Sequence, residues 1–151
     1  MNEDQDALQR AMADIANPWD QHLGTVWDRV EPGIAVEAHV DIDERHLQPY
    51  GIVHGGVLCS IVEIVASMAA TQTAGRPAVG LNNNTDFLRT HRGGRLDARA
   101  TPVHVGRSQH VWQVEVRRAT DDALVARGQV RFQVLDEMPS PRPAQSGSVE
   151  G

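Results

Sequence analysis

Residues 48–73 read QPYGIVHGGVLCSIVEIVASMAATQT, and this stretch decides how the chain folds. It places Gly55 and Gly56 immediately before an almost wholly apolar segment whose one charged residue is Glu63. We expect a helix that begins at one of these glycines and runs to about Thr73. A helix N-terminus offers free N–H groups and a partial positive charge, and glycines let a ligand come close to them. Such donors beside a carboxylate are the minimum parts of an acyl-transfer site.

Apolar side chains cover most of the circumference of this expected helix. The polar exceptions Ser60, Glu63, Ser67 and Thr71 recur every three or four residues and therefore form one narrow stripe. One interpretation is that the stripe simply touches water. The other is that it lines a cleft, because an ordinary solvated face would carry several charges and burial of a lone carboxylate is unfavourable. The residues alone leave both interpretations open.

The rest of the chain predicts strands separated by turns rich in glycine, proline and aspartate. The residues from Ile34 to Ile42 alternate between apolar and polar side chains, as a half-buried strand does. The loop between this strand and the helix spans Arg45 to Val53. The expected strands are His22–Val30, Gly33–Asp43, Ala78–Arg89, Arg95–Val105, Ser108–Ala119 and Leu124–Leu135. One long antiparallel sheet and one apolar helix that only the sheet could bury define an α+β domain.

The chain is expected to hold one main domain with a short extension at each end. Residues 3–16 carry apolar side chains at helical spacing, and Asn17-Pro18 should end that helix. We therefore assign residues 1–20 to an N-terminal helix and lead-in and residues 21–136 to the main domain. Residues 137–151 are dominated by proline, serine and glycine and are predicted to be a disordered tail.

Composition restricts the partners and the compartment. The net charge of −6 argues against nucleic acid or an anionic membrane as the main partner. The single cysteine, Cys59, forms no internal disulfide, which fits a reducing cytosol. Residues 1–10 do not resemble a signal peptide, and the apolar stretch from Val57 to Ala70 is too short to span a bilayer. We expect a cytoplasmic protein.

Several catalytic classes lack their sequence signals. The seven histidines show no ligand spacing with cysteine or carboxylates, so no metal is expected. The chain has no Gly-x-Ser-x-Gly elbow, no P-loop and no dinucleotide fingerprint.

The motif Gln48-Pro-Tyr-Gly-Ile-Val-His54-Gly55-Gly56, with Glu63 and Ser67 downstream, resembles the hotdog-fold acyl-CoA thioesterases. The chain is most similar to the branch that contains the Arthrobacter-type 4-hydroxybenzoyl-CoA thioesterase, the phenylacetic-acid-pathway thioesterases and 1,4-dihydroxy-2-naphthoyl-CoA hydrolase. The resemblance covers residues 22–135, and Phe87-Leu88-Arg89 and Val103 to Ser108 support it.

This resemblance implies a six-stranded antiparallel sheet wrapped around one long central helix. It also implies a homodimer with shared active sites, in which the strand Ala78–Arg89 pairs with its symmetry mate, and we expect a homotetramer. Such pairing would cover an edge that is otherwise a liability.

The resemblance also implies roles for particular residues. Glu63 would be the catalytic carboxylate, acting as general base on water or as nucleophile through a mixed anhydride. Gly55 and its neighbour Gly56 would donate backbone N–H groups that polarise the thioester carbonyl.

Three further polar side chains are candidates in the same site. His54 would orient the carbonyl or the sulfur, although a histidine before a helix also serves as a cap. Gln48 would bond the carbonyl region or the lytic water, or else be an ordinary loop residue. Ser67 would hold the water or touch the acyl group, or else bond back to a helix carbonyl.

The coenzyme A contacts implied by the resemblance fall on three segments. A turn with exposed amides, a hydroxyl and a guanidinium suits phosphate, although the same residues also make ordinary hairpin turns. The residues are Gly80, then Phe87, Leu88, Arg89 and Thr90, then His104, Val105, Gly106, Arg107, Ser108 and Gln109.

We therefore expect a thioesterase that hydrolyses an acyl-CoA, with an aromatic acyl group favoured, and no cofactor apart from the coenzyme A of the substrate. Two other functions are weighed against it: a hotdog dehydratase or hydratase, and a non-catalytic acyl-CoA-binding module. The first usually separates its histidine and carboxylate by more residues than lie between His54 and Glu63, and the second often lacks the helix carboxylate. Hydroxybenzoyl, phenylacetyl, dihydroxynaphthoyl and medium-chain acyl groups stay open, as does acyl carrier protein in place of coenzyme A.

Overall fold

The computed structural model describes residues 6–8, 10–11 and 17–137. The predicted N-terminal helix falls largely outside these ranges, and so does most of the predicted tail. The elements are α2 (Pro18–Leu23), β1 (Thr25–Glu31), β2 (Ala35–Ile42), the 3-10 turn η1 (Glu44–His46), α3 (Gly55–Ala74), β3 (Ala78–Phe87), β4 (Gly94–Val105), β5 (Gln109–Arg118) and β6 (Leu124–Val134).

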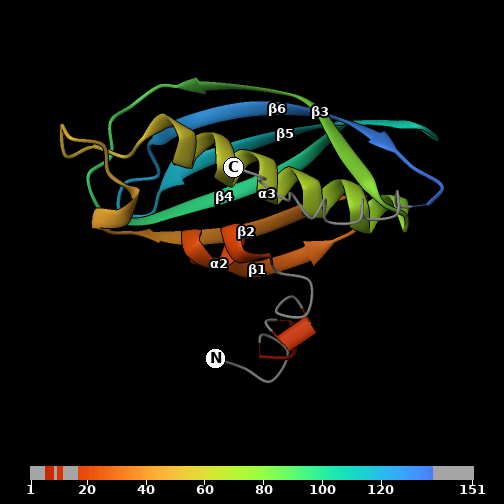
Figure 1. The fold of residues 1–151 in the computed structure, drawn as a ribbon, viewed down its shortest axis with the longest axis horizontal. Coiled ribbons are helices and arrows are strands. Elements are labelled where there is room, and N and C mark those ends of the chain that lie inside the picture. The colour runs from red at the N-terminus through yellow and green to blue at the C-terminus, as the bar shows by residue number, and fades with distance from the viewer. Residues whose placement is uncertain (1–5, 9, 12–16, 138–151) are drawn as a thin grey trace, which may run out of the picture.

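The six strands form a single sheet in the order β1-β2-β4-β5-β6-β3, and every neighbouring pair is antiparallel. Helix α3 lies along one face of this sheet (Figure 1). The order leaves β1 and β3 at the two open edges. The predicted α+β architecture, a six-stranded antiparallel sheet around one long helix, is confirmed.

Helix α3 begins and ends where its capping residues predict. His54 is the N-cap, and its Nδ1 accepts a hydrogen bond of 2.9 Å from the Gly56 N–H. At the other end Gly75 adopts a left-handed φ of 61°, which glycine tolerates without strain, and its N–H bonds to Thr71 O at 3.0 Å. The 20-residue helix is apolar enough to cross a membrane by length and composition. Length alone therefore does not exclude a membrane span, but α3 packs against the sheet as the core helix of the domain.

The core lies between α3 and the inward face of the sheet. Trp112 on β5 and Phe132 on β6 are the largest side chains in it that are fully buried, and Leu96 on β4 joins them. Helix residues Ile61 and Val62 pack on these strands and are 2% and 0% exposed. Burial of one apolar helix on one sheet face is the main stabilising term of the domain.

The predicted start of the first strand at His22 is wrong, because the short helix α2 runs to Leu23 and β1 begins at Thr25. Asn17 is the N-cap of α2, and its Oδ1 accepts from the N–H groups of Trp19 and Asp20 at 2.9 and 3.1 Å. Pro18 follows at the first helical position, where its missing N–H is harmless. Gly24, with φ of 71°, ends α2, so β1 begins only at Thr25. The sequence Asn-Pro fits either end of a helix, and the cap geometry decides between them.

Helix α2 is fixed to the domain by a buried histidine. His46 is 1% exposed; its Nδ1 accepts from the Asp43 N–H at 3.0 Å, and its Nε2 lies 3.0 Å from Leu23 O. The ring therefore carries its proton on Nε2 and donates it to the carbonyl of Leu23. Leu23 itself is 1% exposed. The hydrogen bond from His46 to Leu23 O and the burial of the Leu23 side chain hold α2 beside β1 and α3.

Replacement of Ile61 by alanine should destabilise the domain. The side chain is 2% exposed in the helix–sheet interface, and its loss should lower the free energy of unfolding by about 2–5 kcal/mol. Urea unfolding at a fixed protein concentration measures the change. The matched control is Ile34→Ala, whose side chain is 61% exposed and should change the value by less than about 0.5 kcal/mol. Equal losses in the two variants would contradict this core.

Candidate active site

Glu63 is the only charged residue of α3, and it lies partly buried where the helix faces the edge strand β3. Its Oε2 accepts a hydrogen bond of 3.1 Å from Asn83 Nδ2, and the same nitrogen donates to Cys59 O at 3.0 Å. Burial raises the pKa of Glu63 above its ordinary value, and the hydrogen bond from Asn83 opposes that rise. The carboxylate is therefore poised between two opposing effects, as in many catalytic acids and bases.

Gly80 has no side chain and therefore leaves space for the Glu63 carboxylate against β3. A Cβ at this position would collide with Glu63 Oε1. Gly80 pairs with Phe132 and Asn82 with Arg131, so β3 holds one extra residue at this point. This β-bulge puts Gly80 and Asn83 on the same face although they are three residues apart. The glycine that the sequence assigns to coenzyme A binding thus contacts the catalytic candidate itself.

A groove of about 530 Å³ opens beside Glu63, bounded by α2, β1 and α3. Ser67 lines it one turn further along the helix, as the predicted polar stripe requires. The apolar part of the wall is built from Trp19, Trp27, Ile64 and Met68. Its polar members are Glu63 and Ser67 with Asn17, Asp20, Thr71 and Gln72. Three of the four residues of the predicted stripe, Glu63, Ser67 and Thr71, therefore line this groove, and Ser60 does not.

The N-terminus of α3 carries the amides predicted to bind an oxyanion. The Gly56 N–H is engaged by His54 Nδ1, whereas Gly55 stands at the first helical position, whose N–H has no acceptor within the helix. The ring of Phe87 lies against Gly55 so closely that a Cβ there would come within 2.5 Å of it. The local geometry therefore favours Gly55 over Gly56 as the donor to a ligand.

Gln48 lies in a second, smaller cavity of about 240 Å³ near this helix end. The cavity is also lined by Phe87, Leu88, Arg89 and Thr90. The loop of Gln48 is fixed by a bond from the Gly51 N–H to Gln48 O at 2.9 Å. Arg89 Nη1 donates to Leu124 O at 2.8 Å, which orients its guanidinium. The structure thus brings Gln48 together with the predicted coenzyme A segment from Phe87 to Thr90.

The predicted catalytic residues of one chain do not meet at one point. Gly55 and Glu63 are eight residues apart on α3, which corresponds to about 12 Å along the helix axis. A thioester carbonyl has to lie about 3 Å from both its donor and its attacking group. One chain therefore offers the carboxylate and the amide at separate places.

The predicted coenzyme A segment from His104 to Gln109 lies at the opposite end of the domain. Its turn is closed by a bond from the Gly106 N–H to Gln109 O at 2.9 Å. Arg76, just after the C-terminus of α3, donates to Arg107 O at 3.0 Å. Since α3 has 20 residues, this turn and the N-terminal end of α3 are separated by about 30 Å.

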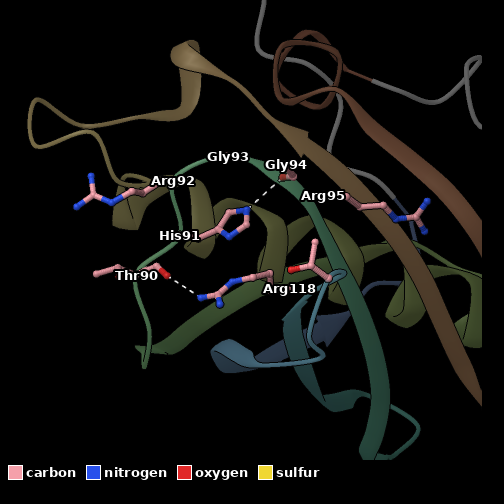
Figure 2. Close-up of a pocket in the computed structure, with 8 residues that line it drawn as sticks. Thr90, His91, Arg92, Gly93, Gly94, Arg95 and Arg118 are labelled. Atoms are coloured by element: carbon pink, nitrogen blue, oxygen red, sulfur yellow. Dashed lines mark hydrogen bonds between the residues drawn. The ribbon is translucent and has the colours of Figure 1, made fainter.

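The loop after β3 also borders a basic pocket of about 310 Å³ that the sequence did not indicate. Arg118 points into it and donates to Thr90 O at 3.0 Å, while His91 Nε2 bonds to Gly94 O at 3.1 Å (Figure 2). Arg92 and Arg95 point outward in opposite directions (Figure 2). The arginines therefore do not converge on one anion, and Arg118 acts as a support for the loop at Thr90.

Sequence reasoning missed Asn83 as the partner of Glu63 and missed the whole of α2 as a groove wall. Asn83 sits within the run Asn82-Asn83-Asn84, where a strict period of two gives no sign of the bulge. Trp19 and Asp20 could have been found only if Asn17-Pro18 had been interpreted as a helix start. Within the described ranges, no three His, Cys, Asp or Glu side chains are grouped so that they could hold a metal ion.

Comparison with known proteins agrees with this geometry. A family model described as Thioesterase superfamily matches residues 50–125. The chain is 41% identical to the Mycobacterium tuberculosis protein Rv1847 over 134 residues, which is 85% of this chain and 94% of that one. The solved structure of that protein superposes with a TM-score of 0.77, covering 82% of this chain and all of the other.

Two further relatives carry names that state an activity. The proofreading thioesterase EntH of Klebsiella pneumoniae is 32% identical over 69% of this chain and 77% of its own length. The 1,4-dihydroxy-2-naphthoyl-CoA hydrolase of Escherichia coli is 36% identical over 54% of this chain and 61% of its own length. The chain belongs to the Thioesterase superfamily and is a thioester hydrolase. The resemblance given by the His-Gly-Gly motif and Glu63 is confirmed.

Replacement of Gly80 by alanine should reduce turnover while leaving the fold intact. The new Cβ would displace the flexible end of Glu63, and a misplacement of about 1 Å can lower the rate on the order of 10²-fold. Thioester hydrolysis and circular dichroism measure the two effects. The control is Ile34→Ala, whose side chain is exposed between β1 and β2 and should leave turnover unchanged. Full activity in Gly80→Ala would show that the carboxylate does not act from this position.

Proposed function

We propose that this protein hydrolyses the thioester bond of an acyl-CoA with an aromatic acyl group, and that two subunits build each active site. The single observation that carries the proposal is the position of Glu63. This lone carboxylate is held by Asn83 and opens into a groove with two tryptophans in its wall. No other residue of α3 offers a charged group for the chemistry.

The proposed reaction uses water and the substrate alone. As general base, Glu63 takes a proton from water, the resulting hydroxide adds to the carbonyl carbon, and the C–S bond breaks to release the acid and the thiol of coenzyme A. As nucleophile, its carboxylate displaces the thiolate to give a mixed anhydride, which water then hydrolyses. Either route places negative charge on the carbonyl oxygen, which the Gly55 N–H at a helix N-terminus would stabilise.

The groove wall supports the choice of an aromatic acyl group. Trp19, which stacks on His22 with ring centroids 5.7 Å apart, offers flat apolar surface in the groove that Glu63 lines, and the largely buried Trp27 backs the same wall. Asp20 lines the same groove and could accept a hydrogen bond from a hydroxyl on the ring. One relative is named for the hydrolysis of 1,4-dihydroxy-2-naphthoyl-CoA, an aromatic thioester with hydroxyl groups.

The separation of the predicted site residues supports a shared site. Strand β3 is an open edge of ten residues with the exposed apolar side chains Val79 and Leu81. Antiparallel pairing of β3 with its copy would set the beginning of one β3 beside the end of the other. The turn at Ser108 is adjacent to the beginning of β3, because Ser108 O accepts from the Val134 N–H and Val134 pairs with Ala78.

In such a dimer the segment His104 to Gln109 of one subunit would approach Phe87 to Thr90 of the other. The Gly55 amide of one subunit would likewise face the Glu63 groove of its partner. Coenzyme A would then lie between the two segments, with Arg89 and Arg107 near its phosphates. We propose a homodimer of this kind that assembles further into a homotetramer, and a cytoplasmic location in keeping with an acyl-CoA substrate and one free cysteine.

Glu63→Ala should abolish hydrolysis without unfolding the protein. Loss of a general base typically lowers the rate by 10²- to 10⁴-fold. Release of free thiol from hydroxybenzoyl-, phenylacetyl-, dihydroxynaphthoyl- and hexanoyl-CoA measures the rates, and the aromatic esters should have the highest kcat/KM in the wild type. The control is Ser60→Ala, one turn before Glu63, whose hydroxyl donates to Gly56 O at 2.8 Å and does not line the groove. Hydration of an enoyl-CoA without thiol release would contradict the proposal.

Arg89→Ala and Arg107→Ala should each raise KM for coenzyme A esters and leave kcat nearly unchanged. Both guanidiniums would contact the nucleotide equally in the ground state and the transition state, so their loss removes uniform binding. Steady-state kinetics with one acyl-CoA measures both constants. The control is Arg99→Ala on β4, which is paired with Glu37 at 3.4 Å and belongs to neither segment. Unchanged KM in both test variants would place the nucleotide elsewhere.

A further inference from the structure

Asn83 is held in one orientation by a second strand residue. Thr85 Oγ1 donates to Asn83 Oδ1 at 2.6 Å, and Asn83 Nδ2 donates to Glu63 Oε2 at 3.1 Å and to Cys59 O at 3.0 Å. A flipped amide would turn its oxygen toward a carboxylate and a carbonyl, and its nitrogen toward the hydroxyl. The carbonyl of Cys59 and the carboxylate of Glu63 only accept, so they fix which end of Asn83 faces Glu63, and the hydroxyl of Thr85 stabilises that orientation by donating to the amide oxygen.

Neighbouring residues make room for this chain of hydrogen bonds. The β-bulge at residues 80–82 turns Asn83 and Thr85 toward α3, opposite Val130 and Gly128 of β6. A Cβ at Gly128 would collide with Thr85 Oγ1 and would lie 2.6 Å from Val62 Cγ1. Gly128 thus leaves space for the threonine hydroxyl beneath the helix.

From this geometry we infer that Thr85 and Asn83 form a positioning relay that aims the Glu63 carboxylate and stabilises its ionised form. The inference rests on the proposed function, in which ionised Glu63 attacks or activates water. Asn83 and Thr85 are positioning residues, because they act through Glu63 and not on the substrate.

Among the described groups around Glu63, Asn83 is the one that donates a hydrogen bond to its carboxylate. Helix α3 has no other charged residue, and the turns on either side of Glu63 offer the thiol of Cys59 and the hydroxyl of Ser67. Strand β3 presents Gly80, Asn83 and Thr85 to the helix, while its one acid, Asp86, is exposed. Helix α2 contributes Asp20 to the shared groove, and β1 contributes Trp27. No cation lines the groove in the described part of the chain, so Asn83 is the donor to this carboxylate.

The sign of the pH effect follows from these contacts. Burial raises the pKa of Glu63, and the Asn83 hydrogen bond lowers it by favouring the ionised form. Without that bond the pKa rises further, so the carboxylate becomes protonated at a higher pH. Because the reaction needs the ionised form, the acidic limb of the kcat/KM profile moves to higher pH in a relay variant.

A purely structural role for Asn83 would give a different result. The bond from Asn83 Nδ2 to Cys59 O also ties β3 to α3, so its loss could lower stability alone. Stability loss changes the amount of folded enzyme equally at all pH values above the unfolding range. A shift of the acidic limb is specific to the ionisation of Glu63.

The test compares pH profiles of kcat/KM for thioester hydrolysis in six forms of the full chain. These are the wild type, Asn83→Ala, Thr85→Val, Thr85→Ser, Asn84→Ala and Glu63→Gln. Asn84 is the matched control, because it is exposed and lines a different cavity on the sheet, with Gln113 and Gln129. Thr85→Ser keeps the hydroxyl that orients Asn83.

The expected result is an acidic limb at higher pH in Asn83→Ala and in Thr85→Val, with the larger shift in Asn83→Ala. At neutral pH, kcat/KM in Asn83→Ala should fall roughly 10- to 100-fold, while KM changes little. Thr85→Ser and Asn84→Ala should follow the wild type. If Asn83→Ala does not fold, the isosteric Thr85→Val decides the result.

Two outcomes distinguish a failure of the relay from a failure of the proposed function. If Glu63→Gln is inactive but the acidic limb stays in place in Asn83→Ala and Thr85→Val, the relay is wrong and the proposed function stands. If Glu63→Gln keeps wild-type turnover, the proposed function fails and the relay fails with it.

Discussion

A carboxylate on an otherwise apolar helix has to be accommodated at the interface between that helix and the sheet. Glu63 projects from α3 toward β3, where Gly80 omits the side chain that would occupy its space. Asn83 supplies a hydrogen bond, and the groove beside α2 keeps the carboxylate open to small molecules. An unpaired buried carboxylate would be strongly unfavourable, so the position needs all three features. The candidate catalytic carboxylate is thus a local exception within the hydrophobic contact that holds the domain together.

The hydrophobic contact between α3 and the sheet also explains how the domain tolerates the carboxylate of Glu63. Helix α3 buries apolar side chains along most of its length, and residues such as Ile61 and Val62 are almost inaccessible to solvent. Each fully buried side chain of this kind stabilises the fold by about 1.5–3 kcal/mol. Against that background, one partly buried acid with a raised pKa is a modest loss. A site that needs a perturbed carboxylate is well placed on a helix that the sheet buries along most of its length.

The length of α3 also organises the predicted contacts with substrate. Its N-terminal end carries Gly55 and lies near Gln48 and Arg89, its middle carries Glu63, and its C-terminal end lies near the turn of Arg107. A rigid helix holds these places apart within one chain. The open edge at β3 lies between them, and it is the edge through which a second copy could bring the two ends together. Oligomerisation and catalysis would then depend on the same strand.

The amino-acid sequence by itself determined the helix α3, the strands and the carboxylate at the centre of the site. Helical spacing, glycines next to both ends of the helix and strict alternation are local signals, so the boundaries of α3 and of most strands agree with the structure. The roles of the individual site residues stay predictions, although the structure places Glu63 and Ser67 in one groove and Gln48 and Arg89 in one cavity.

Only the tertiary structure decided three features: α2, the bulge in β3 and the relay to Glu63. Asn17-Pro18 fits either end of a helix; in the structure Asn17 caps the start of α2, and the contact of Leu23 O with buried His46 fixes that helix to the core. A bulge changes which side chains face inward without changing the residue types, so Asn83 gave no local sign of its role. The position of α2, the bulge in β3 and the relay to Glu63 all depend on contacts between segments far apart in sequence, and local propensity carries no information about such contacts.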